Sequence, residues 1–307
     1  MKVAIPDLIS PSYFPALAAA ELGFFAREGL DFSTELIYPV DRAFRALRDG
    51  EVDFVAGAAH AVPSAFPEWC GAKLLGALAQ GMYWFLVMRA EFGIARGDLT
   101  ALKGRSICAA PWVDIPLRGL LLRAGIDPEQ DHVRIEPVPN TGGAGTNFGL
   151  AAATALERGE IEGFWANGMA AELAVVRGFG AVVLDVRRGD GPPGCFDYTF
   201  PALVTTDRLM ERSPEIAAAA IRALVACQEA LRHDVSLATM VGGRIFPPRE
   251  AGLIAELVGR DLPFYDARIS ATAADSLAGF CRRMGILSQD LAYADLVALK
   301  FQDLWSR

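Results

Sequence analysis

The chain has 307 residues, of which 52% are hydrophobic and 21% charged, and its formal net charge is −8 at pH 7. This composition is that of a globular protein with one large or two medium-sized domains. The acidic balance, without any basic run, argues against nucleic acid and anionic membranes as partners. No uninterrupted run of 18 apolar residues occurs, so no membrane-spanning helix is expected.

The cysteines and histidines exclude several kinds of site. The five cysteines contain no CxxC pair and the three histidines lie far apart, so we expect neither a disulfide framework nor a metal site. No cofactor is expected either. The opening "MKVAIPDL" predicts a strand and is too short in apolar residues for a signal peptide. A cytoplasmic location and a removed leader therefore both stay open.

The first part of the chain alternates predicted strands and helices. The apolar residues follow strand or helix spacing, and Gly29 and Gly50 end the two helices. The predicted strands are 2–6, 31–39, 52–58 and 72–80, and the predicted helices are 15–29 and 41–50. This βαβαβ order predicts a mostly parallel sheet with helices on both faces.

A second round of the same kind begins near Leu102. Its predicted strands are 104–111, 132–139, 161–166 and 181–188, and its predicted helices are 115–126, 148–160 and 170–180. After "YTFPALVTT" the pattern is helical to the end of the chain. The fold class is therefore α/β, with two similar rounds that are not a sequence repeat.

Two extended segments, "YWFLVMRA" and "FDYTFPALVTT", bracket the second round. If both cross between lobes, residues 1–88 and 201–307 form lobe one and residues 89–200 form an inserted lobe two. Two such crossings predict a cleft and a hinge that closes on a ligand.

Ligands of open α/β sheets bind beyond the carboxyl ends of the strands. The polar and aromatic residues that follow the predicted strands are thus the candidate ligand contacts. They are Asp7, Ser10, Ser12, Tyr13, His60, Trp84, Trp112, Asp114, Thr141, Asn147, Trp165, Asn167 and Tyr198.

Several of these candidates have a structural alternative. One of Ser10 and Ser12 is expected to cap the next helix, and His60 is either a backbone-bonded structural residue or a ligand donor. Asp114 is expected to cap the helix that contains Pro116, which would make that helix start a poor site for a bare anion. The indole rings of Trp112 and Trp165 are expected at the rim of the cleft. The alternative is a core position for Trp112 and packing against the neighbouring helix for Trp165.

Two sequence features do not support the sites that they suggest, a nucleotide site and a nucleophilic cysteine. "PNTGGAGTNFG" has Phe148 where a GxGxxG motif needs its third glycine, and it has no Walker lysine, so no nucleotide site is predicted. Cys195 has no histidine beside it in the sequence, so no thiol nucleophile is predicted.

Four motifs in order resemble a known family. "PSYFPALAAAELGFFAREGLDF", "LRDGEVDFVAGAAH", "DLTALKGRSICAAPW" and "LERGEIEGFWANG" are similar to segments of the ABC-transporter solute-binding proteins of the thiamine-precursor, nitrate, sulfonate and taurine (NMT1/THI5-like) group. The resemblance implies a two-lobed type II periplasmic-binding-protein-like fold, each lobe a mostly parallel sheet flanked by helices, with two hinge crossings.

The resemblance also implies a function. It implies capture of a small organic, aromatic or heteroaromatic solute by a monomer, delivery to an ABC permease and a periplasmic location. The same fold hosts a pyrimidine synthase, a sulfinate desulfinase and aromatic acid decarboxylases. A cytoplasmic enzyme or ligand sensor is thus the alternative, with His60 and Asp114 as acid–base candidates and Asp7 as an orienting group.

Overall fold

The computed structural model describes residues 1–139 and 147–306. These residues form two compact units. Unit 1 comprises Met1–Gln80 and Thr199–Arg307, and unit 2 comprises Gly81–Tyr198. The chain therefore passes from one unit to the other twice.

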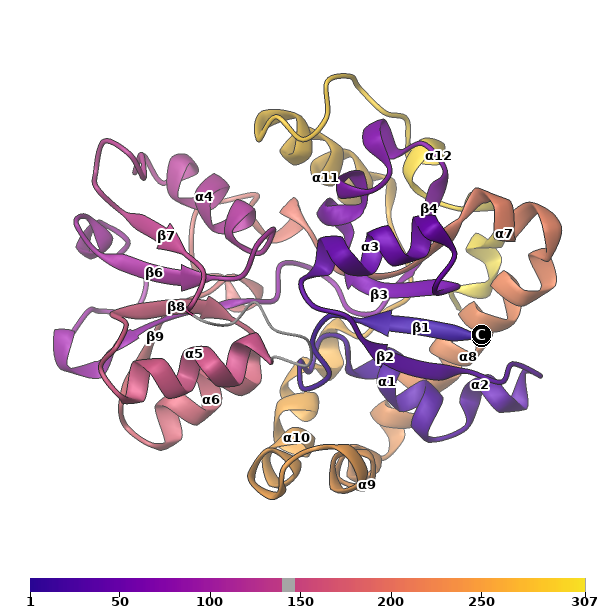
Figure 1. Cartoon of the computed structure of the whole chain (residues 1–307), viewed down its shortest axis with the longest axis horizontal. Helices are drawn as coiled ribbons and strands as arrows, with labels where there is room; N and C mark the ends of the chain where they lie inside the picture. The colour runs from indigo at the N-terminus through magenta and orange to yellow at the C-terminus, as the bar shows by residue number, and fades with distance from the viewer. Residues whose placement is uncertain (140–146, 307) are drawn as a thin grey trace. The chain divides into compact units, whose positions relative to one another are not determined.

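Unit 1 contains one five-stranded sheet in the order β2-β1-β3-β10-β4 (Figure 1). Its strands are β1 (Lys2–Ile5), β2 (Ser33–Leu36), β3 (Phe54–Ala58), β4 (Ala72–Ala77) and β10 (Pro201–Thr206). β1 pairs in parallel with β2 and β3, whereas β10 is antiparallel to both β3 and β4. The carboxyl ends of β1 to β4 consequently share one edge of the sheet, and β10 begins there.

Helices cover both faces of this sheet. They are α1 (Phe14–Glu21), α2 (Phe24–Arg27), α3 (Val40–Asp49), α7 (Asp207–Arg212), α8 (Pro214–His233), α9 (Ser236–Ile245), α10 (Pro248–Asp261), α11 (Ala271–Arg283) and α12 (Tyr293–Leu296). In Figure 1, α3 lies on one face and α1 and α8 lie on the other.

The sequence of α3 shows why it packs where it does. Its buried residues include Val40, Ala43, Phe44 and Leu47, which share one face at helical spacing. Gly50 ends the helix in the left-handed conformation, with φ of 78°, which glycine adopts without strain. All five residues of β3 are buried, as expected of a strand covered on both faces.

Unit 2 repeats this plan. Its strands are β5 (Phe85–Arg89), β6 (Ser106–Ala109), β7 (Arg134–Glu136), β8 (Gly163–Ala166) and β9 (Gly180–Asp185), and its helices are α4 (Asp114–Arg123), α5 (Phe148–Glu157) and α6 (Gly168–Val176). The strand order is β7-β6-β8-β5-β9, and β5 is antiparallel to β8 and β9. In Figure 1, α5 and α6 share one face of this sheet and α4 covers the other.

The fold class predicted from the sequence is confirmed, but the boundaries differ from the predicted ones. The sequence divides the chain at 88/89 and 200/201, whereas the units divide after Gln80 and after Tyr198. The reason is that Phe85–Arg89 forms the antiparallel strand of the second sheet, paired with β8 and β9. The hinge stays a prediction.

Candidate functional site

In unit 1, the loop that follows β1 holds the first group of predicted residues. Asp7 Oδ1 accepts a hydrogen bond from the Ile9 amide at 3.2 Å, and the Ser10 amide donates to the Asp7 carbonyl at 3.4 Å. The Tyr13 amide then donates to the Ser10 carbonyl at 3.1 Å. These turns use the Asp7 carboxylate to hold its own loop.

Ser10 is the polar residue of this loop that the protein leaves unsatisfied. Its side chain is 1% exposed, and its Oγ has no hydrogen-bond partner among the described residues. A buried hydroxyl without a partner costs about 1–3 kcal/mol, so such a group points to a partner that the chain itself does not supply.

The prediction that one of Ser10 and Ser12 caps the next helix is wrong. The N-cap position of α1 is Tyr13, and no side chain caps this helix. Ser12 Oγ instead donates to Asp261 Oδ2 at 3.4 Å, and both side chains are buried. Tyr13, predicted to contact the ligand, is 4% exposed.

His60 follows β3 and is completely buried. Its Nδ1 shares a hydrogen bond of 2.9 Å with Thr199 Oγ1, and its ring makes an edge contact with Phe280 at 6.1 Å between centroids. The His60 ring thus has a hydrogen-bond partner within unit 1, as its structural alternative requires. Its role as a ligand contact stays a prediction.

In unit 2, a row of aromatic rings lies at the corresponding edge of the sheet. Tyr83 and Trp84, which precede β5, have ring centroids 4.2 Å apart, and Trp84 lies 6.2 Å from Trp165 of β8. Arg187, which follows β9, lies over the Tyr83 ring at 5.7 Å. A guanidinium over an aromatic face is a favourable cation–π contact.

Tyr83 and Arg187 of this row are not among the residues predicted from the sequence. Arg187 is 7% exposed, and its Nη2 donates to the Gly81 carbonyl at 3.5 Å. Its place within the predicted strand 181–188 was the available signal, because arginine is rarely this buried unless it has partners.

The prediction that Trp165 lies at a solvent-facing rim is wrong. Its side chain is 0% exposed, and all four residues of β8 are buried, as expected of an interior strand covered on both faces. Trp165 pairs with Leu86 of β5 and Ala109 of β6. Its indole Nε1 is nevertheless buried without a hydrogen-bond partner among the described residues. The role of Trp165 as a ligand contact therefore stays a prediction, and only its predicted exposure is corrected.

Asn147 and Asn167 both act as helix caps. Asn147 Oδ1 accepts from the Leu150 amide at 3.1 Å at the start of α5, and Asn167 Oδ1 accepts from the Ala170 amide at 3.0 Å at the start of α6. A Cβ on Gly149 would lie 2.5 Å from Asn167 Nδ2, so the two helix starts need glycine to approach this closely. Thr141 lies outside the described residues.

The capping prediction for Asp114 is also wrong. Helix α4 begins at Asp114 itself, its N-cap position is Val113, and no side chain caps it. The Asp114 carboxylate pairs with Arg118 one turn later, at 2.9 Å. The preceding Trp112 has a positive φ of 69°, a strained backbone for a bulky residue, and is half-buried.

Tyr198 ends unit 2 and is 5% exposed. Its neighbour Asp197 is half-buried, and burial raises the pKa of the Asp197 carboxyl above its ordinary value. The Phe196 carbonyl accepts from the Met82 amide at 2.8 Å, which joins the two ends of unit 2.

Burial disfavours the thiolate form of three of the five cysteines. Burial raises the pKa of Cys108 to about 11 and that of Cys281 to about 12, and it also raises the pKa of Cys227. A nucleophilic cysteine needs the opposite shift. Within residues 1–139 and 147–306, no group of three or more His, Cys, Asp or Glu side chains is arranged to hold a metal ion.

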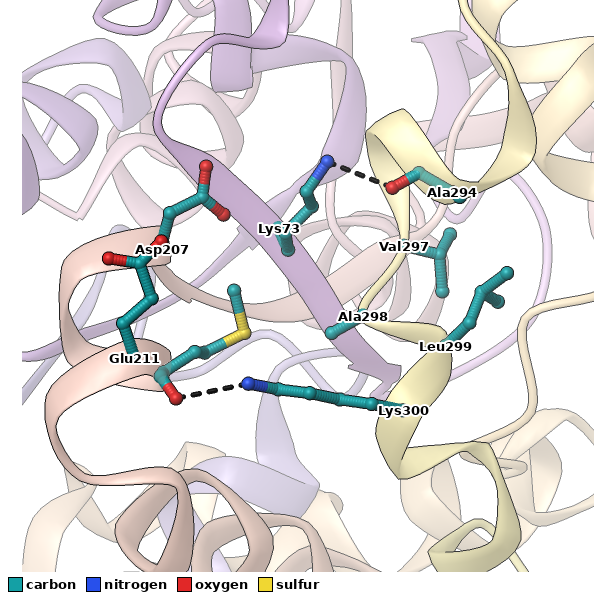
Figure 2. Close-up of a pocket in the computed structure, with 9 residues that line it drawn as sticks. Lys73, Asp207, Glu211, Ala294, Val297, Ala298, Leu299 and Lys300 are labelled. Atoms are coloured by element: carbon teal, nitrogen blue, oxygen red, sulfur yellow. Dashed lines mark hydrogen bonds between the residues drawn. The ribbon is translucent and has the colours of Figure 1, made fainter.

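Unit 1 also has a pocket of about 330 Å³ (Figure 2). It lies where β4 begins and β10 ends, at the sheet edge opposite the predicted residues, and none of those residues lines it. Lys73 Nζ donates to the Ala294 carbonyl at 2.9 Å and Lys300 Nζ to the Met210 carbonyl at 3.0 Å. Its lining is Lys73, Asp207, Met210, Glu211, Ala294, Val297, Ala298, Leu299 and Lys300.

No protein-family model matches the sequence, and no curated protein matches it. Among the described residues, no helix combines the length and apolar content that crossing a bilayer requires.

Solved structures do resemble this chain. The alkanesulfonate-binding protein SsuA of Xanthomonas axonopodis pv. citri, bound to MOPS, has a TM-score of 0.73 at 12% identity, covering 97% of both chains. The periplasmic nitrate-binding protein NrtA of Synechocystis PCC 6803 has a TM-score of 0.75 at 13% identity, covering 99% of this chain and 86% of its own. The desulfurization enzyme DszB has a TM-score of 0.66 at 16% identity, covering 98% of this chain and 97% of its own.

These likenesses define the class of protein at the level of the fold. The chain has the periplasmic-binding-protein fold, with two mostly parallel five-stranded sheets, each flanked by helices. Most of these neighbours are binding proteins, and DszB is an enzyme on the same fold.

Proposed function

We propose that this protein binds a small organic solute for uptake by an ABC-type permease, as a periplasmic monomer of the NMT1/THI5-like group. The solute would contact side chains at the carboxyl strand ends of both units. The support is the fold, whose neighbours include sulfonate- and nitrate-binding proteins, together with the ordered motifs of the sequence.

One observation carries the proposal. Each unit has a buried polar atom near the carboxyl edge of its sheet for which the described chain supplies no partner: Ser10 Oγ in unit 1 and Trp165 Nε1 in unit 2. Proteins seldom leave buried donors unpaired unless a water, ion or ligand pairs with them. A solute with hydrogen-bonding groups that binds at these strand-end edges would supply the missing partners.

The same residues favour a planar solute. The Tyr83, Trp84 and Trp165 rings offer flat apolar faces, the indole N–H is a donor only, and the Ser10 hydroxyl both donates and accepts. An aromatic or heteroaromatic solute with an acceptor for the indole and a donor or acceptor for the serine fits this set better than a small inorganic anion.

A thermal-shift panel followed by calorimetry tests the proposal. Nitrate, sulfate, methanesulfonate, benzenesulfonate and nicotinate are compared. We expect the two aromatic compounds to raise the melting temperature and the three others to leave it unchanged. Stabilisation by nitrate or sulfate alone would contradict the proposed solute class, and stabilisation by none of the five would contradict these solutes as ligands.

The enzyme alternative is supported by the likeness to DszB. Its acid–base candidates, His60 and Asp114, are partnered by Thr199 and Arg118 within their own units. Prolonged incubation with the tightest compound of the panel, followed by mass spectrometry, separates the two functions. We expect the compound to be recovered unchanged, and a changed product would assign catalysis.

A further inference from the structure

The short segment 261–268 of unit 1 contacts two places in the chain. One is the loop after β1, and the other is Gln80, where the chain first leaves unit 1. We propose that Tyr265, in the segment 261–268, is a positioning residue that fixes the Ser10 loop relative to Gln80. This inference rests on the proposed function for the meaning of the loop, but the contacts that carry it lie entirely within unit 1.

The first set of contacts joins the segment to the loop. The Tyr265 hydroxyl donates to the Pro11 carbonyl at 2.5 Å, and the Tyr265 side chain is 1% exposed. At the other end of the same stretch, Asp261 accepts from Ser12 Oγ at 3.4 Å. Pro11 stands between Ser10 and Ser12, so these two bonds fix the backbone on which the unpartnered Ser10 hydroxyl is carried.

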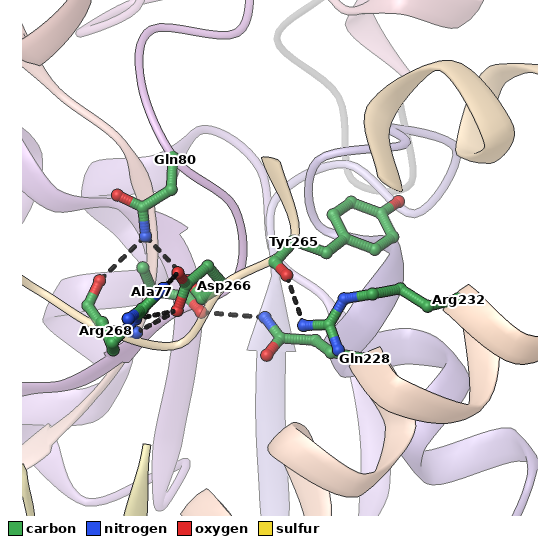
Figure 3. A network of polar contacts seen from close by, with 7 residues as sticks. All are labelled: Ala77, Gln80, Gln228, Arg232, Tyr265, Asp266 and Arg268. Carbon is green, nitrogen blue, oxygen red and sulfur yellow. Dashed lines mark hydrogen bonds and ion pairs between the residues drawn. The ribbon is translucent and has the colours of Figure 1, made fainter. Parts of the chain in front are cut away.

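The second set joins the segment to the end of β4 and to Gln80 (Figure 3). Gln80 Nε2 donates to the Asp266 carbonyl at 2.7 Å and to the Arg268 carbonyl at 2.8 Å. The Gln80 amide donates to the Phe264 carbonyl at 2.7 Å, and the Ala77 amide donates to the Ala267 carbonyl at 2.9 Å.

Two side chains of helix α8 donate hydrogen bonds to the segment and to the end of β4. Arg232 Nη2 donates to the Tyr265 carbonyl at 2.7 Å. Gln228, which is 1% exposed, donates through Nε2 to the carbonyls of Ala77 and Leu78 at 3.1 and 2.9 Å. Figure 3 shows the Gln228 and Arg232 side chains reaching from α8 to β4 and to the segment.

Tyr265 has its side chain on the loop, while the residues on either side of it hold Gln80, so a displacement of the Pro11 carbonyl is transmitted through two hydrogen bonds. Without the Tyr265 hydroxyl, the Pro11 carbonyl keeps the Phe14 amide at 3.3 Å, a longer contact. A solute seated on Ser10 would thereby act on the residue at which the chain leaves unit 1.

Amide hydrogen exchange of the whole chain without solute tests this inference. In Tyr265→Phe, only a hydroxyl is lost, and we expect the amides of Ser10, Tyr13, Ala77 and Gln80 to exchange about five- to tenfold faster. The matched control is Tyr293→Phe, because the Tyr293 hydroxyl also donates to a backbone carbonyl of unit 1, that of Ile269.

A second variant changes Gln80 and measures the effect on the Ser10 loop. Gln80→Met keeps the length of the side chain and removes its two donated bonds, and it should raise exchange at Ser10 and Tyr13. Equal exchange in Tyr265→Phe and Tyr293→Phe would overturn the inference, as would an effect of Tyr265→Phe on the loop alone or an unchanged loop in Gln80→Met. No solute is present, so failure here is distinct from failure of the solute panel.

Discussion

The unpartnered indole of Trp165 gives the sharpest test at the residue scale. Trp165→Phe removes the N–H and keeps an aromatic ring in the buried site. We expect binding of benzenesulfonate to weaken about 5- to 150-fold, corresponding to about 1–3 kcal/mol. The smaller ring leaves a cavity at a fully buried position and so lowers the melting temperature, whereas loss of the orphaned donor removes no hydrogen bond of the native state. Calorimetry and a thermal melt of the same sample measure both quantities.

Trp69 is the control for this variant. Its Nε1 is also buried without a partner among the described residues, but it lies three residues before the amino end of β4. Trp69→Phe should therefore leave affinity for the solute unchanged. If the two variants weaken binding equally, or if Trp165→Phe binds normally, Trp165 is not part of the site.

The buried thiols predict how stability changes with pH. The pKa of Cys108 in the folded state is about 11, above its ordinary value of 9.0. Between pH 9 and 11 the unfolded chain has lost this proton while the folded chain keeps it, so stability falls as pH rises, by up to about 1.4 kcal/mol per pH unit for each such thiol. Cys108→Ala should flatten this slope in urea titrations, whereas Cys70→Ala, at an exposed cysteine, should keep it. Parallel slopes for all three proteins would refute the assignment.

At the scale of elements, Asn167 separates capping from ligand binding. Its Oδ1 caps α6, so Asn167→Ala should cost about 0.5–2 kcal/mol of stability. Asn167→Asp keeps the capping oxygen and replaces the amide nitrogen by a second oxygen. We expect Asn167→Asp to melt close to wild type and to bind benzenesulfonate more weakly, if the Nδ2 donor faces the solute. An Asp variant that binds normally would leave Asn167 as a cap only.

The elements also show what the sequence predicts and what it does not. Helix α3 was predictable because its apolar residues recur on one face and Gly50 ends it. The place of β5 was not, because its partners β8 and β9 lie far along the chain and local spacing does not choose between two sheets. For Trp165 the strand was predicted correctly. Its burial was not, because a strand covered on both faces has no alternation that marks an exposed side.

The candidate site was less predictable than the fold for a related reason. The strand-exit rule finds Ser10 and Asn167, but whether a polar atom is satisfied depends on partners distant in sequence. Asp261 lies 249 positions from Ser12, to which it is bonded, and no local pattern announces that contact. Arg187 was overlooked because an arginine in a Gly-rich segment is usually solvent-exposed.

At the scale of the whole molecule, we expect each unit to fold alone. All strands of each sheet come from one unit, and the ends of unit 2 meet through the hydrogen bond from the Met82 amide to the Phe196 carbonyl, 2.8 Å long. In unit 1, the Leu78 amide donates to the Pro201 carbonyl at 2.8 Å, so a short Gly-Ser linker can join Gln80 to Thr199. Both fragments should therefore show α/β circular dichroism and a cooperative thermal transition.

Binding should not survive this separation. If the solute pairs with Ser10 in unit 1 and with Trp165 in unit 2, each fragment keeps only one of the two buried polar atoms. We expect each fragment to bind benzenesulfonate on the order of 100-fold more weakly than the whole chain, about 2.7 kcal/mol. Calorimetry on folded fragments measures this directly. Full affinity in one fragment would assign the site to that unit alone, and a fragment that stays unfolded would show that its core needs the other unit.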